Sequence, residues 1–164
     1  MVQRTAYQVA LDLLSRRDHF SLELVEKLRT REFPAAEIED AISRCRELDL
    51  INDERVAARF VEVRAADRGW GPRRLAAELR QRGVPADDAD RLSGLSEELA
   101  ANAMRTALRK IEVRAPAVWW RDGQRRARMV SSLITRGFEA DVAIAAVEEL
   151  AASRENQRHG LDDQ

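Results

Sequence analysis

The sequence predicts an all-α protein made of three tandem three-helix repeats, helix-turn-helix-like in form, arranged as an elongated, curved stack. Three observations favour this fold class. Only 5% of the 164 residues are aromatic and 35% are charged, and the sequence has only seven Gly and four Pro, the residues that interrupt helices. This composition suits helices and argues against a β-sandwich or barrel. Apolar residues recur at helical spacing along most of the chain. One short pattern also occurs three times.

The repeated pattern is a helical block with five corresponding positions in each repeat. The second block follows the first by 51 residues, from Leu24 to Leu75, and the third follows the second by 54, from Leu75 to Met129. Apolar residues at i, i+1 and i+4 form one stripe of a helix. The blocks are Leu24, Val25, Leu28, Arg31 and Phe33, then Leu75, Ala76, Leu79, Arg82 and Val84, then Met129, Val130, Leu133, Arg136 and Phe138.

The residue just before the last position of each block, where the helix ends, is expected to take the left-handed conformation. Gly83 and Gly137 occupy this position in the second and third blocks, and Gly adopts that conformation without strain. Glu32 occupies it in the first block, where the same geometry should cost about 1 kcal/mol.

An amphipathic helix is predicted before each block, within residues 6–14, 56–61 and 100–108, because apolar residues there recur at i, i+3 and i+4. A third helix is predicted after each block, opened by Pro34, Pro85 or Glu139. The middle one should be short, because Ser93 and Gly94 interrupt its pattern. The chain therefore has nine predicted helices.

These helices group into repeats at residues 1–52, 53–95 and 96–152, followed by a polar C-terminal tail at 153–164 that we expect to be frayed. A unit of about fifty residues buries too little surface to be comfortably stable alone, so neighbouring repeats should share core.

The residue inventory excludes several classes of function. Cys45 is the only cysteine, and it continues the spacing of Ile38 and Ile42, so a buried thiol is expected rather than a disulfide or a zinc site. His19 and His159 are far apart in sequence, and the sequence contains neither a Gly-rich phosphate loop nor a catalytic triad pattern. We therefore expect no enzyme activity, no metal and no cofactor. No apolar run spans a membrane and no signal peptide is present, which favours a cytoplasmic protein without a membrane partner.

The charge is balanced overall but segregated along the chain. The formal net charge is -1. Between Arg105 and Arg136, however, nine basic residues stand against two acidic ones, and between Arg64 and Arg82 six stand against two. Because salt screens charges beyond about 8 Å, surface potential follows such local clusters.

Basic residues at the start of the second helices run against the helix dipole, whereas acidic residues open the third helices in agreement with it. Residues that oppose the helix-dipole preference are candidates for function. Here that function would be contact with a phosphate-bearing or acidic partner. A merely solvated face is the alternative. The candidate partner- or DNA-binding residues are Lys27, Arg31, Trp70, Arg73, Arg74, Arg80, Arg82, Arg125, Arg126, Arg128 and Arg136.

The tryptophans allow two interpretations. Trp70 lies between Gly69 and Gly71, where it could stack on a base or anchor a protein, or pack beneath the turn. Of Trp119 and Trp120, one is expected in the core and the other exposed. Base reading by a helix-turn-helix is disfavoured, because acidic residues at the start of the third helices would repel phosphate.

The middle repeat resembles the signature of the RecX regulatory proteins of bacteria, and the match extends over about residues 6–150. Agreement is also found in the first repeat at Ser21, Glu23 and Leu24, and in the third at Leu133, Gly137 and Phe138. The signature residues are Leu50, Ile51, Asn52, Asp53, Glu54 and Arg55, followed by Gly69, Gly71, Pro72, Arg73, Arg74, Leu75, Glu78, Leu79, Arg82, Gly83 and Val84.

The resemblance implies a non-catalytic regulator that binds the RecA recombinase and its filament on single-stranded DNA, and that restrains RecA ATP hydrolysis and strand exchange. We expect the protein to be a monomer. Contact with the single-stranded DNA would be made through the filament or directly. Two features depart from the family pattern: Glu32 stands where Gly is usual, and residues 116–123 form an insert. The alternative is a nucleic-acid-binding helical protein, a repressor or coating protein, that acts without a recombinase.

Overall fold

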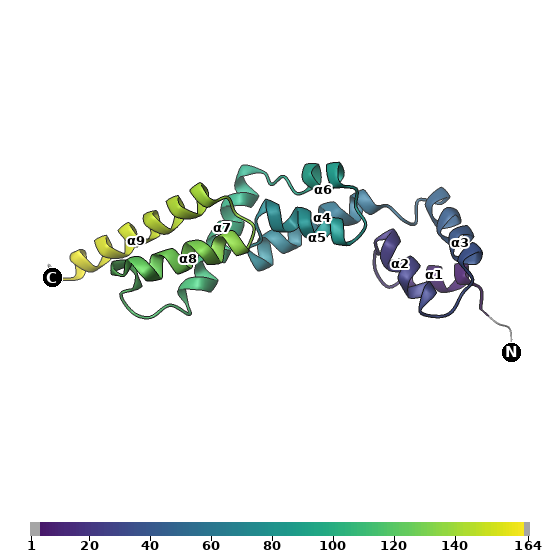
Figure 1. The fold of residues 1–164 in the computed structure, drawn as a ribbon, viewed down its shortest axis with the longest axis horizontal. Coiled ribbons are helices and arrows are strands. Elements are labelled where there is room, and N and C mark those ends of the chain that lie inside the picture. The colour runs from purple at the N-terminus through teal and green to yellow at the C-terminus, as the bar shows by residue number, and fades with distance from the viewer. Residues whose placement is uncertain (1–3, 163–164) are drawn as a thin grey trace. The chain divides into compact units, whose positions relative to one another are not determined.

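The computed structural model describes residues 4–162, with side chains described to residue 158, and this part of the chain is helical without strands (Figure 1). The nine predicted helices are all found there, with one additional 3-10 turn, η1. Their bounds are α1 Ala6–Leu14, α2 Ser21–Arg29, α3 Ala35–Glu47, α4 Asp53–Arg68, α5 Pro72–Gln81, α6 Ala86–Leu92, α7 Glu97–Glu112, η1 Trp119–Arg121, α8 Gly123–Thr135 and α9 Ala140–Asp162.

The helices belong to two compact units. The first unit contains residues 1–60 and 78–92, and the second contains residues 61–77 and 93–164. Both units include parts of α4 and α5. As predicted, α6 is short, at seven residues.

Helices α1, α2 and α3 pack together around an apolar cluster in the first unit (Figure 1). Leu24, Leu28 and Cys45 are fully buried there, which confirms the predicted helix stripes and the buried thiol. The Thr5 side chain accepts a hydrogen bond from the Gln8 backbone, and the Gln8 side chain accepts one from the Thr5 backbone. This reciprocal capping fixes where α1 begins.

A residue in the left-handed conformation follows α2, α5 and α8, as the sequence pattern predicts. Its φ angle is 64° at Glu32, 85° at Gly83 and 92° at Gly137. The backbone geometry is therefore kept even after α2, where the residue is not glycine. Glu32 carries the associated strain, about 1 kcal/mol.

In the second unit, η1 and α8 pack against α9. Trp119 is buried, as expected for one of the paired tryptophans, whereas Trp120 is half-buried rather than exposed. The Trp120 indole Nε1 donates a 2.6 Å hydrogen bond to Glu155 on α9. The insert at residues 116–123 thus has a packing role.

The expectation of a frayed end beginning at Ser153 was wrong, because α9 continues to Asp162. Arg154 forms two hydrogen bonds with the Glu112 carboxylate on α7, at 2.6 and 2.8 Å. This pairing with Arg154 holds the pKa of Glu112 below its usual value. Such contacts stabilise a polar helical extension that hydrophobic periodicity alone does not predict.

Candidate anion-binding site

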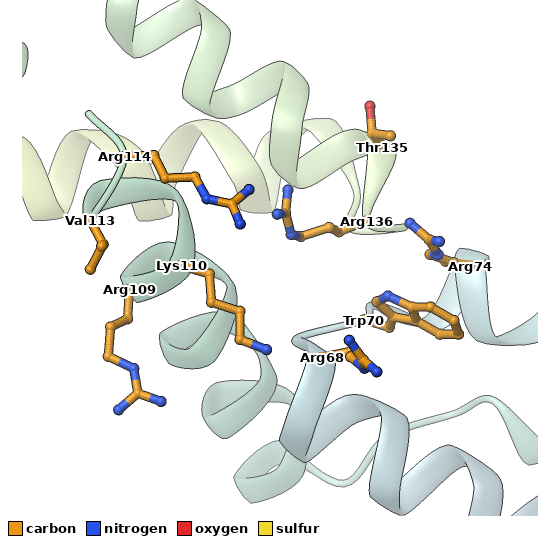
Figure 2. Close-up of a pocket in the computed structure, with 9 residues that line it drawn as sticks. All are labelled: Arg68, Trp70, Arg74, Arg109, Lys110, Val113, Arg114, Thr135 and Arg136. Atoms are coloured by element: carbon orange, nitrogen blue, oxygen red, sulfur yellow. The ribbon is translucent and has the colours of Figure 1, made fainter. Parts of the chain in front are cut away.

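A pocket of about 580 Å³ opens in the second unit beside the turn between α4 and α5 (Figure 2). Six of its nine lining residues are cationic and none is acidic. We call this group of six the cationic cluster. It consists of Arg68, Arg74, Arg109, Lys110, Arg114 and Arg136.

The close approach of two backbones brings parts of this cluster together. The Gly71 amide donates a 2.7 Å hydrogen bond to the carbonyl of Arg136, and the Arg73 amide donates a 3.1 Å bond to that of Gly137. A Cβ on Gly71 would lie 2.5 Å from the Gly137 carbonyl oxygen, and one on Gly137 would overlap the backbone of Arg74. Only glycine fits at either position, and this fit places the start of α5 beside the end of α8.

Trp70 holds one of the cations in place. Its ring lies under the Arg74 guanidinium, with Cζ 4.2 Å from the ring centroid, and Arg64 lies 5.7 Å from the same centroid. Cation–π contact of this kind orders a flexible arginine at a partly exposed site. Trp70 is half-buried: part of it packs at the turn, and part of it lines the pocket, where a partner could reach it.

Two further cations are anchored to backbone carbonyls. Arg136 Nη1 donates a 2.9 Å hydrogen bond to Ser132, and the Lys110 ammonium donates to Asp67. Figure 2 shows the guanidinium groups of Arg114 and Arg136 pointing toward one another. Burial, with Arg114 and Arg74 nearby, lowers the pKa of Arg136 below its usual value. The pocket therefore has excess positive charge.

A second, smaller pocket of about 350 Å³ shares Lys110, Arg114 and Arg136 with the first. Its other basic lining residues are Arg125 and Arg128 on α8. Arg125 Nε donates a 2.8 Å hydrogen bond to Asp122, while Arg128 is exposed and forms no ion pair within the described residues.

The structure brings five of the predicted site residues to these two neighbouring pockets: Trp70, Arg74, Arg125, Arg128 and Arg136. Arg73 and Arg126 belong to the same unit but bind carboxylates, Arg73 to Glu139 and Arg126 to Glu148.

The remaining four predicted residues lie in the first unit and make local contacts. Lys27 lies 3.6 Å from the Glu23 carboxylate, and Arg31 donates to the Lys27 carbonyl. Arg80 pairs with Asp90, and Arg82 pairs with Glu78 while lying over the Phe60 ring.

The pocket also contains four cationic residues that the predicted site did not include: Arg68, Arg109, Lys110 and Arg114. They lie at or near the ends of α4 and α7. The local excess of basic residues was the signal for them in the sequence. They lie outside the second helices, to which the opposition between basic residues and the helix dipole points.

Within residues 4–162, no helix has the length and apolar character needed to cross a membrane. Among the same residues, no group of three or more His, Cys, Asp or Glu side chains is placed to hold a metal ion. The helices and the pockets define an all-helical protein whose second unit carries an arginine-rich, positively charged surface.

Comparisons with known proteins identify the family. Residues 6–45 match the model of the first three-helix domain of RecX, and residues 52–92 match that of the second. The chain is 35% identical over 136 residues to "Regulatory protein RecX" of Pseudomonas entomophila, covering 82% of this chain and 84% of the relative. It is 37% identical over 139 residues to the protein of that name from Pseudomonas fluorescens, with the same coverage.

A solved structure agrees with these matches. The crystal structure of RecX from Lactobacillus salivarius superposes with a TM-score of 0.74 at 26% identity, covering 88% of this chain and 94% of that chain. The chain belongs to the RecX family of regulatory proteins.

Proposed function

We propose that this protein binds the RecA recombinase and its filament on single-stranded DNA, and that it lowers RecA ATP hydrolysis and strand exchange. Membership of the RecX family carries this proposal. The protein acts by occupying sites on the filament, as a cytoplasmic monomer that catalyses no reaction of its own and needs no cofactor. Its repeats, proposed at residues 1–52, 53–95 and 96–152, would contact successive positions of a periodic partner and gain avidity.

The contact residues are proposed to be the basic side chains of the second helices and Trp70. Arg74 and Arg128 are the most available of these, since neither side chain forms an ion pair with a carboxylate or a hydrogen bond with a backbone carbonyl in the described part of the chain. Arg31 and Arg136 donate to backbone carbonyls of this chain. The others would have to exchange a carboxylate of this chain for a carboxylate or a phosphate of the partner. The remaining members of the set are Lys27, Arg31, Arg73, Arg80, Arg82, Arg125, Arg126 and Arg136.

Co-sedimentation tests the proposal against the alternative of a protein that binds nucleic acid without a recombinase. The protein is mixed with RecA filaments on single-stranded DNA, with bare single-stranded DNA and with duplex DNA over a salt series. We expect strong association with the filament and weak association with bare DNA. Tight binding to bare DNA with a steep salt dependence, and no gain from RecA, would support the alternative instead.

A further inference from the structure

The cationic cluster brings six basic side chains without a carboxylate partner to a single pocket. Elsewhere, basic residues commonly meet acidic ones, as Arg17 meets Glu23 and Arg91 meets Glu54. None of the six cations lining the larger pocket forms an ion pair with a carboxylate among the described residues. The missing countercharge must come from solvent ions or from a ligand.

The cluster is partly preorganised for such a ligand. Trp70 supports Arg74, a backbone carbonyl holds Arg136, and another holds Lys110. Five of the six cations are arginines, whose planar guanidinium groups match phosphate oxygens in a two-pronged geometry. Side chains fixed before binding lose less entropy when the ligand arrives.

The size of the pocket and the number of its cations decide between kinds of phosphate ligand. Successive phosphates in a nucleic acid strand are separated by a sugar, so a pocket of about 580 Å³ admits few of them. In a polyphosphate, neighbouring phosphorus atoms share an oxygen, and several negative charges fit into the same space. The charge of the cluster is better matched by the compact ligand.

We propose that this pocket binds a free polyphosphate, such as inorganic tripolyphosphate or the phosphate chain of a nucleoside triphosphate. The phosphates lie among Arg74, Arg114, Lys110 and Arg136, four basic residues that line the pocket. The base contributes little, because Arg74 covers a face of Trp70, the aromatic ring that lines the pocket. Mg²⁺ competes with the cluster for the same oxygens and weakens binding. This inference does not depend on contact with RecA.

Isothermal titration calorimetry of the 164-residue chain in Mg²⁺-free buffer tests the inference. Tripolyphosphate, ATP and GTP are expected to bind with similar affinity, ADP more weakly and AMP weakest. Addition of Mg²⁺ should weaken the binding of ATP. Absence of tripolyphosphate binding, or equal affinity for AMP and ATP, would overturn the proposal.

A matched pair of variants on the same part of the chain locates the site. Arg114→Gln removes an exposed cation of the cluster and should weaken tripolyphosphate binding about tenfold, the loss of one charge-assisted contact. Arg105→Gln removes an exposed cation of α7 that does not line the pocket, and should bind like the parent protein. Equal losses in both variants would indicate a general charge effect and contradict the assignment.

A short oligothymidylate of comparable charge separates a free polyphosphate from a nucleic acid strand. It is expected to bind more weakly than tripolyphosphate and to depend less on Arg114. If it binds more tightly and loses the same factor in Arg114→Gln, the ligand is a strand and the proposal is wrong. Thermal melting of each variant verifies that it is folded, and Arg109→Gln provides a second exposed position in the cluster.

Discussion

Gly137→Ala is expected to lower the free energy of unfolding by about 2 to 5 kcal/mol, the combined cost of a left-handed alanine and of overpacking. Gly137 has a φ angle of 92°. An added Cβ would overlap the Arg74 amide nitrogen and lie 2.6 Å from the Arg74 Cβ. Chemical denaturation of the purified variant measures the loss.

Gly123→Ala is the matched control for this change. Gly123 begins α8, and a Cβ there would meet nothing within 4 Å. Alanine also favours helix over glycine, so stability should stay the same or rise by up to about 1 kcal/mol. Equal unfolding free energies for the two variants would show that the close backbone approach at Gly137 is absent in solution.

Leu28→Ala is expected to cost about 2 to 5 kcal/mol, the range for removing a fully buried leucine from a core. Leu28 has no solvent exposure and packs within the cluster formed by α1, α2 and α3. These small helices have limited means to fill the cavity. Thermal and chemical denaturation should both report the loss.

Leu48→Ala provides the comparison for Leu28→Ala, because the Leu48 side chain is 60% exposed at the end of α3. Its effect should be within about 0.5 kcal/mol, as is usual for surface substitutions. A loss at Leu28 no greater than that at Leu48 would contradict the assignment of this stripe to the core.

The helices could be predicted from the sequence because each carries its own local signals. Apolar stripes such as Leu24 with Leu28 and Met129 with Leu133 define buried helix faces, and all four residues are buried. Gly83 and Gly137 indicated where second helices end. The end of α9 could not be found in this way, because polar contacts such as Arg154 with Glu112 hold it in place.

The pocket could be predicted only in part, for a different reason. The excess of basic residues was visible in the sequence, but their convergence depends on Gly71 meeting Gly137 across 66 positions of the chain. The ion pairs that these arginines form within the chain could not be predicted from the sequence either. Arg125 and Arg126 run against the dipole of α8, yet Asp122 and Glu148 compensate part of that charge. These ion pairs therefore explain in part why basic residues stand at the start of α8, where the helix dipole disfavours them.

The account depends most on the claim that this chain restrains a recombinase filament through its arginines. The direct measurement is the rate of ATP hydrolysis by RecA filaments on single-stranded DNA as the protein is added. We expect the wild-type protein to lower this rate, and Arg74→Glu/Arg128→Glu to need at least about tenfold more protein, the equivalent of about 1.4 kcal/mol.

Arg59→Glu/Arg105→Glu is the charge-matched control, since both residues are exposed and neither lines the pockets. It should inhibit like the wild-type protein. A rate of ATP hydrolysis that stays constant throughout the wild-type titration would contradict the account. Equal inhibition by the wild-type protein and Arg74→Glu/Arg128→Glu would show that the arginines have been assigned wrongly.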